Sequence, residues 1–182
     1  PCGPGSYAEE PGSPSCTAAK AGYYVNASSD RTEETPCDEG FFSPSPGASE
    51  CIPCSPGTYT NATAQSVCKP ADPGSYVGKA GLSAQTSCDS GKYTDTAGQS
   101  TCLFTEPGKV ANADNSGQVD CAAGETSESG ASESGGVCVP CGPGSYASAA
   151  GSPRCTLASE GHFVKDSDTT QQFECPVGRY AP

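Results

Sequence analysis

Cysteine pairs with a 14-residue spacing recur along this chain, and this spacing restricts the fold more than any other feature. A cysteine, a glycine three positions later and an aromatic residue two positions after it form the motif C-x2-G-x-[YF]. In five places a second cysteine follows the first by 14 positions. The octapeptide PCGPGSYA begins at Pro1 and again at Pro140. Such repetition is typical of a structural module rather than of a catalytic loop.

The chain is too poor in apolar residues to fold around an ordinary core. Leu, Ile, Val and Phe make up about a tenth of the 182 residues, whereas folded domains rarely fall below about 20%. The sequence has 23 glycines and 17 prolines, and it lacks Met and Trp. Its 13 cysteines change the expectation, because disulfides replace a core in many small secreted proteins.

Metal binding is the alternative use of so many cysteines. Zinc sites require CxxC pairs combined with further Cys or His pairs, and only Cys51/Cys54 and Cys138/Cys141 have that spacing. His162 is the one histidine of the sequence. We therefore expect disulfides and no metal, and hence an extracellular protein, secreted or at a cell surface.

Four stretches without cysteine keep the same register. Where two motifs adjoin, the closing and opening cysteines form C-x2-C, so a missing motif should begin three residues after a closing cysteine. These opening positions are Ala19, Ala71, Thr105 and Ala158, and a glycine stands three residues after each. The sequence therefore predicts a small disulfide-rich fold, mostly irregular with short β-hairpins, in an elongated linear array of about eleven repeats of about 17 residues. The predicted repeats with cysteine span 1–18, 37–53, 54–70, 88–104, 121–140 (with an insertion), 141–157 and a partial 175–182, and those without span 19–36, 71–87, 105–120 and 158–174.

Repeats without cysteine lack the opening and the closing cysteine together, which indicates bonds within repeats. Bonds between repeats would leave partners unpaired wherever a pair is missing. The predicted pairs are Cys2–Cys16, Cys37–Cys51, Cys54–Cys68, Cys88–Cys102, Cys121–Cys138 and Cys141–Cys155. Cys175 is the odd cysteine, and we expect its partner in the continuation of a longer protein beyond Pro182; a free reactive thiol is the alternative. Glu34, Gln85, Gln118 and Gln172 occupy the vacant closing positions, and we predict that the three glutamines fill the vacated sites with hydrogen bonds.

Each repeat should form a small hairpin. The glycine after the opening position suits a tight turn with positive φ, and a second glycine, as at Gly12, Gly47, Gly98 and Gly151, should reverse the chain. Isolated hairpins are marginal in water, so each aromatic should pack on the disulfide or aromatic of the next repeat, with contacts to nearest neighbours. The predicted stacking aromatics are Tyr7, Tyr24, Phe42, Tyr59, Tyr76, Tyr93, Tyr146, Phe163 and Tyr180.

The pattern C-x2-G-x-[YF]-x8-C-x2-C resembles the ephrin-receptor-like cysteine-rich repeat, a relative of the tumour necrosis factor receptor modules. The stretch CIPCSPGTYTNATAQSVC, from Cys51 to Cys68, matches best, and the resemblance covers the whole chain. It implies an extracellular, elongated stalk linked by disulfides, as in receptors, surface proteins and large protist proteins. Four repeats depart from the family pattern by lacking cysteine, and no ligand-binding residue of the family maps onto this chain.

Several short motifs suggest covalent or ionic additions. Asn26 and Asn61 lie in N-x-[ST] sequons, which predict N-linked glycans in a secreted chain. The stretches 43–49 and 125–136 are rich in Ser, Thr, Pro and Gly, and are interpreted either as O-glycosylated segments or as plain flexible loops. The stretch 112–120 partly matches a calcium loop, with Asn112, Asp114 and Ser116 as ligands, but Ala123 stands where the bidentate Glu is required. An Asx-rich turn is the favoured interpretation, and we expect no cofactor.

The negative net charge argues against two classes of partner, and two functional hypotheses follow from the sequence as a whole. A net charge of −12 argues against nucleic acid and against anionic membranes, and no apolar run is long enough to span a bilayer. No nucleophile can be paired with His162, so we do not expect an enzyme. The leading hypothesis is a structural extracellular glycoprotein that associates with itself or with other extracellular proteins in a fibre, surface coat or flagellar-hair-like filament. The alternative is the ligand-binding stalk of a cell-surface receptor.

Overall fold

The computed structural model describes residues 2–10, 12–28, 30–130 and 136–179. Over these residues the chain has no helix and consists of short two-stranded antiparallel sheets joined by irregular segments. Together with six disulfides, this arrangement confirms the predicted class, a small disulfide-rich fold of short β-hairpins.

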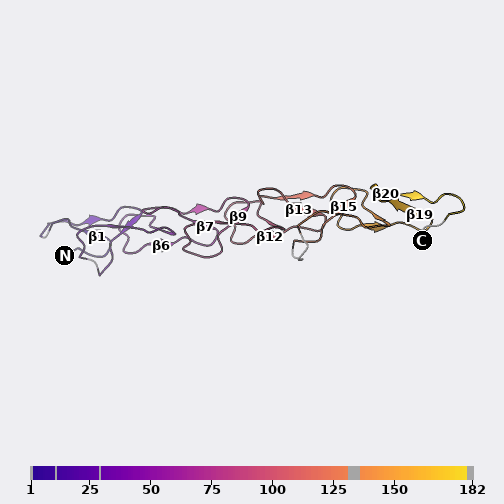
Figure 1. Cartoon of the computed structure of the whole chain (residues 1–182). Coiled ribbons are helices and arrows are strands. Elements are labelled where there is room, and N and C mark those ends of the chain that lie inside the picture. The colour runs from indigo at the N-terminus through magenta and orange to yellow at the C-terminus, as the bar shows by residue number, and fades with distance from the viewer. Residues whose placement is uncertain (1, 11, 29, 131–135, 180–182) are drawn as a thin grey trace. The chain divides into compact units, whose positions relative to one another are not determined.

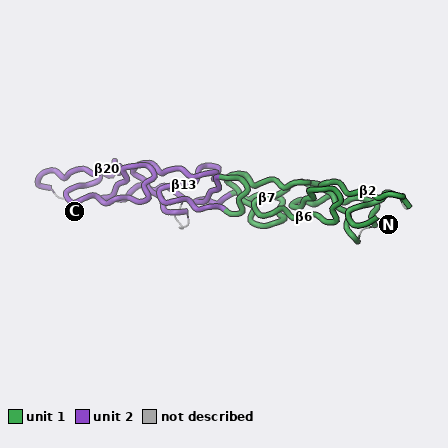
Figure 2. Tube along the Cα trace, turned by 180° about the vertical axis from the view of Figure 1, so that it is seen from behind, with its two compact units in different colours: residues 1–87, 96–101 green, residues 88–95, 102–182 purple. Residues whose placement is uncertain are grey.

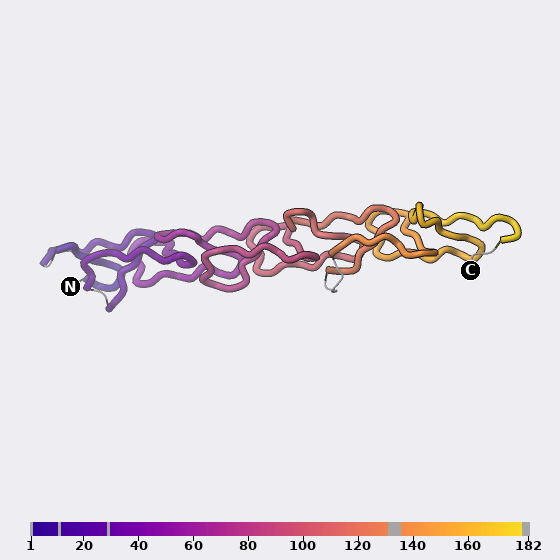
Figure 3. The backbone as a smooth tube through the Cα atoms, viewed as in Figure 1, coloured from indigo at the N-terminus to yellow at the C-terminus, as the bar shows by residue number. Residues whose placement is uncertain are grey.

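The chain divides into two compact units, which are coloured separately in Figure 2. The first comprises Pro1–Ser87 with Thr96–Thr101, and the second comprises Cys88–Asp95 with Cys102–Pro182. Within each unit the hairpins follow one another in chain order (Figures 1 and 3).

Every strand pairs with its neighbour in the sequence, so β1 pairs with β2, β3 with β4, and so on to β19 with β20. The strands of the first unit are β1 (Ser6–Tyr7), β2 (Thr17–Ala18), β3 (Tyr23–Tyr24), β4 (Thr35–Pro36), β5 (Phe41–Phe42), β6 (Ile52–Pro53), β7 (Thr58–Tyr59), β8 (Lys69–Pro70), β9 (Ser75–Tyr76) and β10 (Thr86–Ser87). Those of the second unit are β11 (Lys92–Tyr93), β12 (Leu103–Phe104), β13 (Lys109–Ala111), β14 (Gln118–Asp120), β15 (Glu125–Thr126), β16 (Val139–Pro140), β17 (Ser145–Tyr146), β18 (Thr156–Leu157), β19 (His162–Lys165) and β20 (Asp168–Glu174).

A glycine in the left-handed region precedes the first strand of each hairpin. The glycine three residues after the opening position has φ between 72° and 87° throughout. In the same turn the backbone N–H of Phe41 donates to the Asp38 carbonyl at 3.0 Å, across Gly40. Glycine at the third position of such a turn is the pattern of a type II β-turn, which confirms the turn predicted from the sequence. The glycines are Gly5, Gly22, Gly40, Gly57, Gly74, Gly91, Gly108, Gly124, Gly144, Gly161 and Gly178.

A second left-handed residue reverses the chain between the two strands. Gly12, Gly47, Gly98 and Gly151 have φ between 73° and 85°, as the reversal requires. In the repeat 54–70 the same position holds Ala64, with φ of 59°, and in the repeats 19–36 and 105–120 Arg31 and Asn115 are left-handed between the two strands, with φ of 59° and 57°. Because left-handed backbone is unfavourable for residues with a Cβ, these three repeats must gain enough from packing to hold it.

Backbone hydrogen bonds join each hairpin to the next one. The N–H of Gly22 donates to the Ser43 carbonyl of the following repeat at 2.9 Å. In the opposite direction, the N–H of Gly47 donates to the Ala19 carbonyl at 2.8 Å. The same two bonds recur between later repeats, and they satisfy backbone groups that a lone hairpin would leave unpaired.

Contacts also reach the repeat after next, which corrects the expectation of nearest-neighbour contacts. A Cβ atom added to Gly5 would lie 2.1 Å from the carbonyl oxygen of Gly47, two predicted repeats along the chain. An added Cβ on Gly57 would lie equally close, 2.1 Å, to the carbonyl of Gly98. The hairpins are thin, and a turn residue without a side chain lets the backbone of the third repeat approach this closely.

The core consists of small clusters rather than one apolar interior. In the first unit, Tyr7 packs with Ala19 and Val25, and Tyr59 packs with Ala71 and Val77 in the same way. Tyr23, an aromatic of the following repeat, also packs against the Tyr7 cluster, as expected. Ala19 and Ala71 take the place of the expected disulfide, because the following repeat begins with alanine instead of cysteine.

The other predicted stacking aromatics are less enclosed. Tyr24, Phe42, Tyr76, Tyr93, Tyr146 and Phe163 are half-buried, and Tyr180 lies outside the described residues. Among the described residues, the one pair of aromatic rings in contact is Phe163–Phe173, with centroids 5.8 Å apart. Both rings belong to the hairpin β19–β20, so this contact lies within a repeat.

Candidate functional site: the closing contacts of the repeats

Six disulfides close hairpins in this structure. They join Cys2–Cys16, Cys37–Cys51, Cys54–Cys68, Cys88–Cys102, Cys121–Cys138 and Cys141–Cys155, the pairs expected from the register. The Cα atoms of each pair lie between 5.6 and 5.9 Å apart. The opening cysteines are buried and their partners are more exposed, so each bond ties the interior of a repeat to its surface. Cys175 is half-buried and makes no disulfide within this chain.

Three glutamines close repeats that have no disulfide, which confirms the prediction of hydrogen bonds there. The Gln85 Oε1 atom accepts from the Asp72 backbone N–H at 2.7 Å. Gln118 and Gln172 accept in the same way from Glu106 and Ser159, at 3.0 and 2.8 Å. The donor is in each case the residue after the opening position. The glutamine amide therefore closes the equivalent loop, but it bonds to the residue after the opening position instead of to the opening residue itself.

Glu34 closes the repeat 19–36 with a charged version of this contact. Its Oε2 atom accepts from the Lys20 backbone N–H at 2.8 Å, and its Oε1 atom accepts from Lys20 Nζ at 3.0 Å. Burial opposes ionisation of the carboxyl group, but the bonds from Lys20 outweigh it and lower the pKa of Glu34. Sequence reasoning assigned hydrogen bonds only to the glutamines, although Glu34 stands at the equivalent position.

A valine accompanies three of these hydrogen-bonded closures. Val25, Val77 and Val164 follow the aromatic position in repeats without cysteine, and the first two are 1% exposed. In the disulfide-closed repeats the same position carries Ala, Ser or Thr, namely Ala8, Ser43, Thr60, Thr94, Ser127 and Ala147. The larger apolar side chain offsets part of the stabilisation that the missing disulfide would provide. Sequence reasoning missed this substitution, although aligning the repeats on their turn glycines reveals it.

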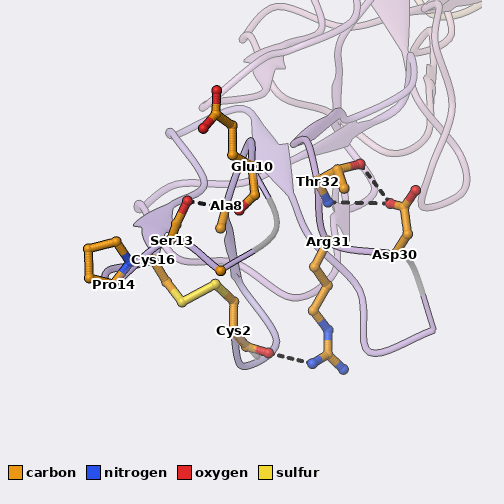
Figure 4. A pocket seen from close by; sticks show the side chains of 10 residues that line it. Cys2, Ala8, Glu10, Ser13, Pro14, Cys16, Asp30, Arg31 and Thr32 are labelled. Atoms are coloured by element: carbon orange, nitrogen blue, oxygen red, sulfur yellow. Dashed lines mark hydrogen bonds between the residues drawn. A yellow bond between two sulfur atoms is a disulfide. The ribbon is translucent and has the colours of Figure 1, made fainter.

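Arg31 lies in a cavity of about 500 Å³ beside the first disulfide (Figure 4). Its guanidinium donates through Nη1 to the Cys2 carbonyl and through Nη2 to the Ala27 carbonyl, the latter at 2.7 Å. In the repeat 19–36 the carbonyl of the opening residue, Ala19, instead accepts from a backbone N–H of the next repeat, that of Gly47. The arginine side chain thus replaces a backbone donor between repeats.

Asn115 makes the corresponding contact in the second unit. Its Nδ2 atom donates to the Cys88 carbonyl at 2.8 Å, and the Thr94 N–H donates to the Asn115 carbonyl at 3.0 Å. Arg31 and Asn115 therefore combine left-handed backbone with a side-chain bond to the preceding repeat. Each side-chain bond replaces the bond that the backbone N–H of a turn glycine, such as Gly47, donates to the opening carbonyl in other repeats.

The residues considered for calcium form a turn stabilised by their own side chains. Asp114 Oδ1 accepts from the N–H and the hydroxyl of Ser116, at 3.1 and 2.7 Å. Those bonds lower the pKa of Asp114. Asn112 Oδ1 accepts from the Gly117 N–H at 3.1 Å. This is the Asx-rich turn favoured from the sequence, and no group of three or more His, Cys, Asp or Glu side chains in the described ranges could hold a metal ion.

The two sequon asparagines differ in exposure. Asn61 is exposed, whereas Asn26 is half-buried and its Oδ1 accepts from the Ser28 N–H at 2.9 Å. In the stretch 43–49 the Ser43 side chain is fully buried and donates to the Ser45 carbonyl, so Ser43 is not an acceptor for O-linked sugar. Ser45 and Ser49 are exposed. In the stretch 125–136, residues 131–135 lie outside the described residues.

His162 lies in β19, and its Nδ1 atom is 3.1 Å from the Glu160 carbonyl oxygen. No helix among the described residues could cross a bilayer. No protein-family model matches the chain, and no curated protein matches it significantly.

Proposed function

We propose that this chain is a repeat segment of a structural extracellular glycoprotein, one that forms a fibre, surface coat or flagellar-hair-like filament. The observation that carries the proposal is that a disulfide or a hydrogen bond closes each of these repeats, combined with backbone bonds from each repeat to the next. Each closing contact described above holds the two ends of a hairpin together. Such an arrangement suits a protein whose task is mechanical, because its bonds maintain a backbone path instead of shaping a reaction site.

The disulfides support an extracellular location for the proposed function. Six disulfides persist only in an oxidising environment. We propose N-linked glycans at Asn61 and Asn26, with Asn61 the more accessible of the two. With a net charge of −12, glycans and acidic side chains would keep a chain so poor in apolar residues soluble.

Imaging distinguishes this function from the receptor stalk that the family resemblance also allows. The native material, purified under oxidising conditions and examined by negative-stain electron microscopy, should form periodic filaments. Dispersed monomers or a membrane-bound population would contradict the filament and favour a stalk that binds a protein ligand. Glycosidase treatment followed by intact-mass measurement tests both sequons, with Asn61→Gln and Asn26→Gln each expected to remove one glycan.

A further inference from the structure

Repeats without cysteine interrupt the series of disulfides at intervals. The repeat 19–36 separates Cys16 from Cys37, the repeat 71–87 separates Cys68 from Cys88, and the repeat 105–120 separates Cys102 from Cys121. Each of these three segments is therefore bounded on both sides by a loop that is covalently closed.

The two kinds of repeat would respond differently to a pull on the backbone. In the disulfide-closed repeat 54–70 the Cα atoms of Cys54 and Cys68 are 5.8 Å apart. Tension passes across that bond, so the residues between the two cysteines cannot straighten. The loop keeps its length for as long as the disulfide is intact.

Only noncovalent contacts close the repeat 71–87. Gln85 accepts from the Asp72 N–H at 2.7 Å and donates through Nε2 to Asp72 Oδ2 at 2.8 Å. Ala71 packs with Tyr59 and Val77. The Gly98 N–H donates to the Ala71 carbonyl at 2.8 Å. All of these contacts can separate and form again without any chemical reaction, so this repeat can straighten and refold.

We propose that the repeats without cysteine are the extensible segments of this protein, which open under tension while the disulfide-closed repeats keep their length. The inference goes beyond a structural role, because it concerns the response of the chain to load and holds for a filament and for a stalk. It also explains why glutamine and glutamate occupy closing positions that cysteine could fill.

The spacing of the disulfides sets the length that each opening releases. A segment of about 20 residues between two disulfides extends to at most about 70 Å, because an extended chain spans about 3.3–3.6 Å per residue. Detaching a disulfide-closed repeat from its neighbours releases far less, since its loop stays shut. Released length therefore identifies which kind of repeat has opened.

Optical tweezers test the proposal on the oxidised 182-residue protein, tethered at its two ends. We expect the first openings to occur in separate steps, each releasing a contour of about 20 residues or less. Reductant added under load should then release the six disulfide loops as additional length. A single event that opens all repeats together, or first steps as short as a detached disulfide repeat, would overturn the proposal.

A matched variant adds a disulfide to one extensible segment. Ala71→Cys with Gln85→Cys should shorten one step in the oxidised protein, and reductant should then release the missing length in addition to that of the six native loops. Unchanged release, with the new disulfide verified by mass, would contradict the proposal. Gln85→Ala guards against failure of that bond to form, because it should lower the opening force of one step without changing its length. Opening forces in Gln85→Ala that are the same as in the unsubstituted protein would count against the proposal.

Discussion

The close approach of the backbone of one repeat to that of another determines which residues are tolerated at several positions in this protein. Several turn glycines, among them Gly5, Gly40 and Gly57, combine left-handed φ with a contact to the repeat after next. A Cβ on Gly40 would lie 2.2 Å from the Gly81 carbonyl oxygen, whereas a Cβ on Gly47 would have no atom within 4 Å. Both glycines have φ of 82°. Comparing substitutions at Gly40 and Gly47 therefore separates the free energy lost through the close contact from that lost through the left-handed backbone.

Gly40→Ala should destabilise the protein by about 3 kcal/mol and Gly47→Ala by about 1–2 kcal/mol. The first carries the cost of left-handed alanine and of displacing the repeat after next, and the second carries only the cost of left-handed alanine. Urea denaturation under non-reducing conditions measures the difference. Equal destabilisation would mean that the contact with Gly81 has no energetic weight.

Glu34 should make the repeat 19–36 sensitive to acid. The pKa of Glu34 is lower in the folded state than its ordinary value of 4.5, so its ionised form stabilises the fold above that pH. This contribution should decline as the pH falls below 4.5 and through the lowered pKa of the folded state. Following the Lys20 amide signal by NMR between about pH 2 and 6 would detect the loss of the contact.

Glu34→Gln is the control, because an amide accepts from the Lys20 N–H as Gln85 does from Asp72 but does not titrate. The variant should hold the Lys20 signal constant over the same pH range. A titration that persists in Glu34→Gln would show that another group is responsible.

Hairpins are the elements of this fold, and two kinds of closing contact define them. A disulfide across a loop of about 15 residues stabilises by about 3 kcal/mol, whereas a hydrogen bond contributes about 1 kcal/mol. Valine after the aromatic offsets part of this difference in the repeats 19–36 and 71–87, where Val25 and Val77 are almost fully buried.

Gln85→Ala should lower the free energy of unfolding by about 1 kcal/mol, because the Asp72 N–H loses its acceptor. Gln65→Ala is the matched control, since the Gln65 side chain bonds only its near neighbour Thr63, at 3.0 Å. Thermal unfolding monitored by circular dichroism compares the two variants. If both variants lose the same stability, the closing position has no special role.

Much of the hairpin could be predicted from the sequence, because its determinants are local. Gly22 and Gly161 locate turns in repeats that have no cysteine, and Gln85 marks a closing position by its distance from the next cysteine. Contacts to the repeat after next could not be foreseen, since they depend on how thin hairpins stack. The left-handed Ala64 likewise has no local signal, because only its place in the repeat distinguishes it from other alanines.

At the scale of the whole molecule, stability is distributed over many equivalent contacts. The two compact units have the same construction, with turn glycines, closing contacts and bonds to the next repeat. Because each disulfide lies within one repeat, no disulfide links a repeat to its neighbours. Determining which cysteines are paired is therefore the most informative test of the division into repeats.

Peptide mapping of the native, non-reduced protein should find six disulfide-linked pairs, each within one repeat. The decisive peptides are those around Cys16 and Cys37, which flank a repeat without cysteine. A bond between these two cysteines would contradict the repeat scheme. Finding Cys16 with Cys2 and Cys37 with Cys51 would support it.

The cysteine-free repeats that lie between disulfide pairs have a consequence for oxidative folding of this chain. A thiol meets a partner 14 positions away more readily than one beyond an intervening repeat, because closing a longer loop costs more chain entropy. The cysteine-free repeats thus act as spacers between successive pairs of thiols. Scrambled isomers should concentrate at the junctions Cys51/Cys54 and Cys138/Cys141, where two pairs adjoin, and disulfide isomerases would be needed mainly there.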